Sequence, residues 1–247
     1  MTNNQKKERI DKLLVTRAYT STREKAKALV MEGRVYANGV KVEKPGDLLP
    51  VDAGIEISGG LKYVSRGGLK LEDALKQFNI QTTDRIAMDV GASTGGFTDC
   101  LLQHGAKKVY AVDVGYGQLD WKLRNDQRVV LLERTNIRYL EKSVIPDPID
   151  LAVVDVSFIS LLKVLPKVQE FLNKKAEIVA LIKPQFEVGK GYVGKGGIVR
   201  DSQKRLEVVE SIKDAAQAMG FCVKGTIKSP ILGAKGNEEY LIHLLFE

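Results

Sequence analysis

Residues 89–98 read Asp-Val-Gly-Ala-Ser-Thr-Gly-Gly-Phe-Thr, and they begin at the end of the short apolar segment Ile86–Val90. Beyond them, the pattern predicts a helix that runs to about His104. Glycine has no Cβ and lets the backbone approach a ligand closely, and the first N–H groups of a helix lack intrahelical partners. A strand, a glycine loop and a helix in this order are typical of a nucleotide-binding turn.

The residues around this loop indicate which ligand it would bind. Asp113 ends the next apolar segment, about 20 residues further on, where an acidic side chain can accept hydrogen bonds from both ribose hydroxyls. Ser93 occupies the place where the dinucleotide fingerprint has its second glycine, so the loop is poorly suited to a pyrophosphate. Asp89 would repel a phosphate but suits a cationic or amino-acid end. These features favour S-adenosylmethionine (SAM) over NAD, and the alternative is a tight turn without a ligand.

Seven apolar segments alternate with helical segments in the larger, later part of the chain. They lie at residues 86–90, 109–114, 129–134, 151–156, 178–183, 221–227 and 240–246. Strands that alternate with helices predict a mostly parallel sheet covered on both faces. Asp155 and Lys183 stand at the carboxyl ends of two such strands, where open α/β sheets bind ligands. We therefore expect both side chains to converge on the glycine loop, with an exposed salt bridge as the alternative.

Residues 1–60 have a different pattern and carry more Lys and Arg than Asp and Glu. Two short amphipathic helices end before Gly33, and Asn38-Gly39 suits a two-residue hairpin turn. This part is predicted to form a compact α-α-β unit. Residues 61–65 are interpreted as a connector to a second domain at residues 66–247.

The composition excludes several classes of protein. Lys+Arg 38 against Asp+Glu 31 give a formal net charge of +7, a moderate excess that is compatible with a polyanionic partner. Cys100 and Cys222 have no metal-ligand spacing, and no disulfide framework is expected, so a reducing cytoplasm is the default location. The most apolar run, residues 149–162, contains Asp150 and Asp155 and is shorter than the roughly 20 residues that a membrane-spanning helix needs. We predict neither a metal site nor a membrane span.

Several further motifs follow one another along the chain. They are Arg66-Gly67-Gly68-Leu69-Lys70-Leu71, Asp89 to Thr98, Val112-Asp113-Val114-Gly115, Arg134-Thr135-Asn136-Ile137-Arg138, Asp155-Val156-Ser157-Phe158-Ile159-Ser160, Ile182-Lys183-Pro184-Gln185-Phe186-Glu187 and Asn237-Glu238-Glu239-Tyr240. Together they resemble the TlyA, or hemolysin A, family of ribosomal RNA 2′-O-methyltransferases. The resemblance covers nearly the whole chain. It implies an α/β fold with a doubly wound, mostly parallel seven-stranded Rossmann-like methyltransferase sheet, preceded by a small α+β S4-like RNA-binding domain.

The resemblance also implies three sets of functional residues. Related FtsJ-type ribose methyltransferases use a Lys-Asp-Lys-Glu tetrad, and the matching positions are Lys70, Asp155, Lys183 and Glu239. Glu239 is chosen over Glu238 because the family's glutamate directly precedes the aromatic residue that begins the last strand. The residues implied to bind SAM are Asp89, Gly91, Ser93, Thr94, Gly95, Gly96, Phe97, Asp113, Asn136 and Asp155. Those implied to bind RNA phosphates are Arg9, Arg17, Arg23, Lys25, Lys27 and Arg34, with a solvated helix face as the alternative.

Methyl transfer to a ribose explains why these residue types occur together. A ribose hydroxyl keeps its proton at neutral pH, so the reaction needs proton removal or stabilisation of the developing negative charge. Two neighbouring lysines, Lys70 and Lys183, favour a neutral amine that could act as the base, whereas Asp155 and Glu239 favour the charged form. The sequence leaves this balance open. No metal is required.

Three alternatives remain at this point. Methylation of a nitrogen is disfavoured, because residues 155–158 lack the Asn/Asp-Pro-Pro-aromatic loop that is common in amine methyltransferases. A membrane-perturbing protein is suggested by the hemolysin name, but the chain has neither an apolar span nor a strongly amphipathic basic helix. An RNA-binding factor without catalysis is disfavoured by the intact tetrad. The expected substrate is a cytidine ribose in ribosomal RNA or a ribosomal subunit, recognised by shape, and nothing in the sequence requires a particular oligomer.

Overall fold

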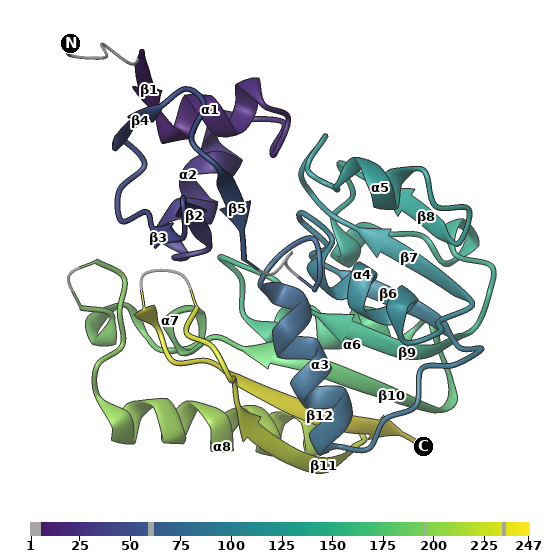
Figure 1. The fold of residues 1–247 in the computed structure, drawn as a ribbon. Helices are drawn as coiled ribbons and strands as arrows, with labels where there is room; N and C mark the ends of the chain where they lie inside the picture. The colour runs from purple at the N-terminus through teal and green to yellow at the C-terminus, as the bar shows by residue number, and fades with distance from the viewer. Residues whose placement is uncertain (1–5, 59–61, 195, 234–235) are drawn as a thin grey trace, which may run out of the picture. The chain divides into compact units, whose positions relative to one another are not determined.

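The computed structural model describes residues 6–58, 62–194, 196–233 and 236–247. The chain divides into two compact units, residues 1–62 and 63–247, and each is considered by itself (Figure 1). The predicted connector at 61–65 begins with Leu61, which lies outside the described residues. Tyr63, in contrast, is 1% exposed and packs in a core of the second unit.

The first unit is a small α+β fold with two sheets. Its elements are β1 (Lys7–Arg9), α1 (Ile10–Thr16), α2 (Arg23–Met31), β2 (Val35–Ala37), β3 (Val40–Lys41), β4 (Leu48–Pro50) and β5 (Ile55–Ile57). Strand β2 pairs antiparallel with β3 and β5, and β1 pairs antiparallel with β4. Ile10, Leu14 and Val35 are fully buried in its core. The small strands β1 and β4 were not predicted, since Lys7–Arg9 is a polar segment without apolar alternation.

The hairpin between β2 and β3 is confirmed. Asn38 has a φ of 49° and Gly39 a φ of 78°, the two left-handed conformations that a two-residue loop requires. Ala37 and Val40, on either side of them, are paired across the two strands. The turn residues thus fix the register of this small sheet.

A buried carboxylate joins the start of the chain to both helices. Asp11 is fully buried, and its Oδ2 lies 2.9 Å from Nη2 of Arg9 and 2.8 Å from Nη2 of Arg23. The hydrogen bonds from Arg9 are the largest cause that holds the pKa of Asp11 well below its usual range, and those from Arg23 add to this against the effect of burial. The cluster ties α1 to α2 by charge as well as by apolar packing.

The second unit is built on a seven-stranded sheet. Its strands are β6 (Ile86–Val90), β7 (Lys108–Val112), β8 (Val129–Leu132), β9 (Ile149–Val154), β10 (Leu172–Ile182), β11 (Phe221–Lys228) and β12 (Tyr240–Phe246). Their order across the sheet is β11-β12-β10-β9-β6-β7-β8. Strand β12 is antiparallel to both of its neighbours, and the pairs from β10 to β8 are parallel. The predicted mostly parallel sheet is confirmed.

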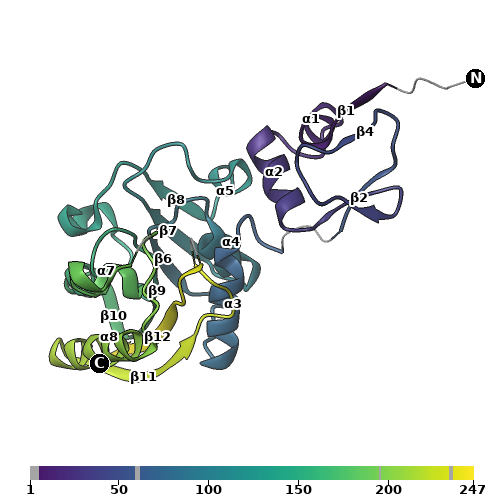
Figure 2. The same cartoon turned by 90° about the vertical axis from the view of Figure 1, so that its left-hand side faces the viewer.

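Helices cover both faces of this sheet. They are α3 (Gly67–Gln77), α4 (Gly96–Gln103), α5 (Trp121–Arg124), α6 (Leu165–Gln169), α7 (Pro184–Glu187) and α8 (Ser202–Ala218), with short 3₁₀ helices at Ile137–Tyr139, Lys142–Val144, Leu161–Lys163 and Lys190–Tyr192. Successive strand residues face opposite sides, so Val109 and Ala111 pack with α3 and α4, whereas Tyr110 and Val112 belong to the core that contains α6 and α8. Figure 2 shows α3 and α4 on one side of the sheet and α8 on the other. The arrangement is doubly wound, as predicted.

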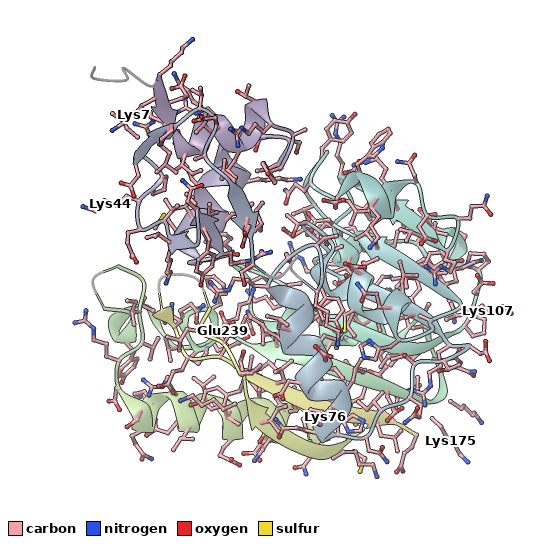
Figure 3. The ribbon with its side chains drawn as sticks, viewed as in Figure 1. Lys7, Lys44, Lys76, Lys107, Lys175 and Glu239 are labelled. Atoms are coloured by element: carbon pink, nitrogen blue, oxygen red, sulfur yellow. The ribbon has the colours of Figure 1, made fainter. Side chains whose placement is uncertain are left out.

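Strand β10 differs from the prediction at its start. It begins at Leu172 rather than at Ile178. Residues 173–175 are polar and exposed, so they give no apolar signal for a strand, and Figure 3 shows Lys175 directed outward. The pairing with β9 is irregular between Leu172 and Glu177, and Lys175 has a φ of 63°. Backbone pairing, rather than apolar burial, extends the strand.

We predict that Asp11→Asn lowers the free energy of unfolding of the first unit by about 1–2 kcal/mol at pH 7, because it removes a buried charged acceptor of two partly exposed arginines. Since folding lowers the pKa of Asp11, its contribution is present at neutral pH and is lost as the pH falls below about 4. Urea denaturation of the native chain and the variant should show a difference that shrinks with acidification. Glu56→Gln, at an exposed carboxyl of β5, is the control. Equal stabilities at pH 7 would contradict the prediction.

Candidate active site

The loop between β6 and α4 brings its backbone close to its neighbours. Gly91 has a φ of +89°, and a Cβ at this position would lie 2.5 Å from the carbonyl oxygen of Asp155. Gly95 has a φ of +93°, and a Cβ there would overlap the side chain of Leu123. Both positions require glycine, for the left-handed backbone and for the close approach. The strand, glycine loop and helix that the sequence predicts are confirmed.

Asp89 lies beneath this loop. Its side chain is fully buried, and Oδ2 accepts a 2.7 Å hydrogen bond from Oγ1 of Thr98. Burial raises the pKa of Asp89 to about 7, the hydrogen bond from Thr98 opposes this, and the charge of Asp155 raises it further. From the sequence we expect Asp89 to bind the ligand, and this stays a prediction. In the structure Oδ2 faces Thr98, while Oδ1 is buried and has no hydrogen-bond partner among the described residues.

Asp113 follows β7 and is held in place by two backbone amides. The amide of Ser93 donates to Oδ2 at 2.7 Å, and that of Gly115 donates to Oδ1 at 2.6 Å. Each carboxylate oxygen keeps a lone pair that can accept a hydrogen bond from a hydroxyl. The carboxylate is therefore fixed beside the glycine loop in a form that can bind a ribose.

Two cavities adjoin at the carboxyl ends of the strands. The larger has a volume of about 840 Å³, and the smaller, of about 240 Å³, lies toward α3. Gly91, Ser93 and Asp155 line both of them. The residues predicted to bind SAM that line one or both cavities are Gly91, Ser93, Thr94, Gly96, Phe97, Asp113, Asn136 and Asp155. Asp89 and Gly95 line neither of these two cavities: Asp89 is buried at the end of β6, and Gly95 packs against Leu119 and Leu123.

One buried ion pair joins α3 to the start of β12. Nζ of Lys70 lies 2.6 Å from Oε2 of Glu239, and the two side chains are 10% and 2% exposed. Figure 3 marks Glu239 at the beginning of this strand. The neighbouring Glu238 forms ion pairs with Arg205 and Lys228 instead. The structure thus brings Glu239, and not Glu238, to Lys70.

A second ion pair joins the ends of β9 and β10. Nζ of Lys183 lies 2.5 Å from Oδ1 of Asp155 and donates a 2.9 Å hydrogen bond to Oγ of Ser157. The approach to Asp155 lacks hydrogen-bond geometry, so attraction between the charges holds this pair. Lys70 and Asp155 both line the smaller cavity. The four predicted catalytic residues therefore form two ion pairs at one space.

Three further residues of the site had no role assigned from sequence. Ser157 holds the amine of Lys183, and Nε2 of Gln185 lies 3.5 Å from Oε1 of Glu239. Phe158 is 91% exposed on the rim of the larger cavity and has a φ of 63°. Their position in the sequence could have identified them as site residues, because all three follow the carboxyl ends of β9 and β10. Residue type alone did not separate them from ordinary loop residues.

The six basic residues predicted to bind RNA have different surroundings in the first unit. Four of them bind groups of the unit itself: Arg9 and Arg23 bind Asp11, Arg17 donates to the carbonyls of Val51 and Ala53, and Arg34 pairs with Glu32. Lys25 and Lys27 are exposed on α2. The four arginines thus stabilise the unit, and this stabilising role was not predicted.

The described part of the chain contains no helix with the length and apolar character to cross a membrane. It also contains no group of three or more His, Cys, Asp or Glu side chains arranged to hold a metal ion. Cys100 and Cys222, which both lie in the described part of the chain, are not joined in a disulfide.

Two known protein-family models match the sequence of this chain. A family model described as FtsJ-like methyltransferase matches residues 63–246, which is most of the chain, and one described as S4 domain matches residues 8–55. The chain belongs to the FtsJ-like methyltransferase family. The S4 match confirms the predicted nature of the first unit, and the FtsJ-like match confirms that of the second.

Relatives of this FtsJ-like methyltransferase resemble it over both units. A Bacillus subtilis protein named as a candidate rRNA methyltransferase, YqxC, is 51% identical over 97% of this chain and 86% of its own length. The 16S/23S rRNA (cytidine-2′-O)-methyltransferase TlyA of Mycobacterium tuberculosis is 45% identical over 96% of this chain and 89% of its own length. A solved structure named as a candidate hemolysin of Streptococcus thermophilus has a TM-score of 0.78 and 48% identity, covering 98% of this chain and 89% of that chain. The resemblance to the TlyA family is confirmed.

We predict that the stability of the native chain falls as the pH rises from about 5 to about 7, because folded Asp89, with its pKa raised to about 7, retains a proton that the unfolded chain releases near pH 4. Asp89 lowers the free energy of unfolding by up to about 1.4 kcal/mol for each pH unit of this range. Asp89→Asn keeps an acceptor for Thr98 but does not ionise, so it should remove this slope. Urea denaturation across the pH range measures it, with Asp214→Asn on the exposed face of α8 as the control. If the free energy of unfolding varies with pH equally in the native chain and in Asp89→Asn, the raised pKa of Asp89 is refuted.

Proposed function

We propose that this protein transfers the methyl group of SAM to the ribose 2′-hydroxyl of a cytidine in ribosomal RNA. The proposal is carried by two ion pairs, Lys70 with Glu239 and Lys183 with Asp155, each of which has one member in the wall of a cavity that shares the glycine loop. This arrangement suits an oxygen nucleophile whose proton must be removed. The names of the relatives support ribosomal RNA and cytidine, and the S4 unit supports an RNA partner.

The residues of the larger cavity fit SAM. Val112, Ile137 and Val156 provide apolar surface for a flat adenine ring, and the fixed carboxylate of Asp113 can accept from ribose hydroxyls. Gly91 lines both cavities, and its lack of a Cβ lets the loop lie directly against the backbone of Asp155. SAM, when bound, supplies an electrophilic methyl group and leaves as a neutral thioether.

Lys183 is the proposed general base. In its neutral form, Nζ accepts the proton of the 2′-hydroxyl while the oxygen forms its bond to the methyl carbon. Ser157 and Asp155 hold Nζ in place, and Asp155 balances the positive charge that forms on the lysine. Lys70 provides a positive charge near the developing oxyanion, and Glu239 orients Lys70. The remaining task is alignment of the hydroxyl with the methyl group.

RNA binding is assigned to the first unit, which is an S4 domain. Lys25 and Lys27 are exposed on α2, where basic side chains can neutralise phosphates. Recognition is expected to depend on the shape of folded RNA. The proposed ribosomal RNA substrate supports a cytoplasmic location.

The decisive experiment uses ribosomal subunits from a strain that lacks this protein, incubated with the full chain and labelled SAM. Digestion of the RNA and mass spectrometry of the nucleosides should identify 2′-O-methylcytidine. Lys183→Ala should reduce turnover by at least about 100-fold, because it removes the base, whereas Lys213→Ala on α8 should not change it. A base-methylated nucleoside, or no product although SAM binds, would overturn the proposal.

Adjacent glutamates provide a matched test of the tetrad. Glu239→Gln should lower kcat about 10- to 100-fold, because it weakens the charge that orients Lys70, and should leave the affinity for SAM nearly unchanged. Glu238→Gln should stay within about two-fold of the native kcat, since its partners are Arg205 and Lys228. Single-turnover kinetics with the same subunits measure both. Equal losses in the two variants would assign the effect to the strand start as a whole and not to the pair with Lys70.

A further inference from the structure

An arginine lies over an exposed tyrosine near the larger cavity. Cζ of Arg134 is 4.1 Å from the ring centroid of Tyr116, within cation–π distance. Tyr116 is 67% exposed, and Arg134 is exposed as well. The two residues follow the carboxyl ends of β7 and β8, the edge of the sheet at which the site lies. Neither residue lines either of the two cavities described above.

The backbone holds this stack in a fixed geometry. Arg134 has a φ of 52°, a left-handed conformation that is uncommon for a long side chain. Its amide donates to the carbonyl of Gly115 at 2.9 Å, and the amide of Gly117 donates to Oε1 of Glu133 at 2.7 Å. The turn that carries Tyr116 is thus fastened on both sides to the segment that carries Arg134. The uncommon backbone therefore keeps the guanidinium on the ring.

The guanidinium of Arg134 keeps its charge available. The neighbouring carboxylate, Glu133, is engaged by Arg124 through Nη1 at 3.1 Å and Nη2 at 2.6 Å. Among the described residues, no carboxylate lies within ion-pair distance of Arg134. An exposed, positively charged and planar surface of this kind suits a nucleic acid, which offers a flat base and an anionic phosphate.

A second arginine–tyrosine contact places the surface beside the cavity mouth. Cζ of Arg138 lies 5.2 Å from the ring centroid of Tyr139, which is 75% exposed. Residues 135–137, which lie between Arg134 and Arg138 in the sequence, line the larger cavity together with Arg138 itself. The two contacts therefore lie at either end of a cavity-lining segment.

We propose that the Tyr116–Arg134 stack is an RNA-contact site of the methyltransferase unit, which binds an unpaired nucleotide close to the target cytidine. The base stacks on the tyrosine–guanidinium surface, and the N–H groups of Arg134 bind the adjoining phosphate. This inference rests on the proposed function, because the occupant is a part of the same RNA. The S4 unit would contact phosphates of the RNA, and the Tyr116–Arg134 stack would provide a second contact, to a base.

The test separates stacking from charge. Dissociation constants for unmodified ribosomal subunits are measured over a monovalent-salt series with the full chain and its variants. Tyr116→Ala should weaken binding about ten-fold without changing the salt dependence, whereas Tyr116→Phe, which keeps the ring, should bind within about two-fold of the native chain. Arg134→Ala should weaken binding and reduce the salt slope by about one. Lys107→Ala, at the opposite end of β7 and directed outward in Figure 3, is the charge control and should change neither.

Methyl transfer measured on the same samples distinguishes the two proposals. In Tyr116→Ala and Arg134→Ala, KM for the subunits should rise while the affinity for SAM stays native. If the native chain methylates ribose but both variants bind RNA as tightly as it does, the stack is not an RNA site and the proposed function stands. If Tyr116→Phe loses as much affinity as Tyr116→Ala, the hydroxyl and not the stacked ring makes the contact, and the inference is overturned. A native chain that transfers no methyl group overturns the proposed function itself.

Discussion

The close approach of Gly91 to the backbone of Asp155 is the constraint on which the site depends. A Cβ at residue 91 would lie 2.5 Å from the carbonyl oxygen of Asp155, and the amide of Asp155 donates to the carbonyl of Val90 at 2.9 Å. This contact fixes the glycine loop against the end of β9. It sets the distance between the glycine loop and the carboxylate that pairs with Lys183. The parallel register of β6 with β9 produces the contact, so the reacting geometry is a property of the sheet.

Ion pairs between lysines and carboxylates stabilise the charged side chains at the carboxyl end of the sheet. Lysines and carboxylates are costly to bury alone, and here each buried lysine has a carboxylate partner at an adjacent strand or helix end. The two pairs bring the net charge of these four side chains close to zero. One member of each pair, Lys70 and Asp155, lines the smaller cavity. Asp89 avoids the cost of a buried charge in another way. It has no cationic partner among the described residues and lies beneath the loop, so burial favours its neutral form.

Much of this could be predicted, because position along a parallel sheet carries chemical information. The strand ends at Asp113, Asp155 and Lys183 were readable from apolar runs that each stop at a charge. The orientation of side chains was less accessible. Asp89 is predicted to bind the ligand, and the sequence gives no sign that its side chain is fully buried; Arg9 and Arg23 are predicted to bind RNA phosphates, and the sequence gives no sign that they hold Asp11. Such outcomes depend on contacts between residues distant in sequence, and local spacing does not encode them.

Asp155 lines both cavities, and this shared wall has an evolutionary consequence. Under the proposed function, a substitution there would alter the space for SAM and the space beside Lys70 at once, so the two could not be tuned independently through this residue. Residues that line one of the two cavities only, such as Phe158 in the larger and Leu232 in the smaller, do not carry this double constraint.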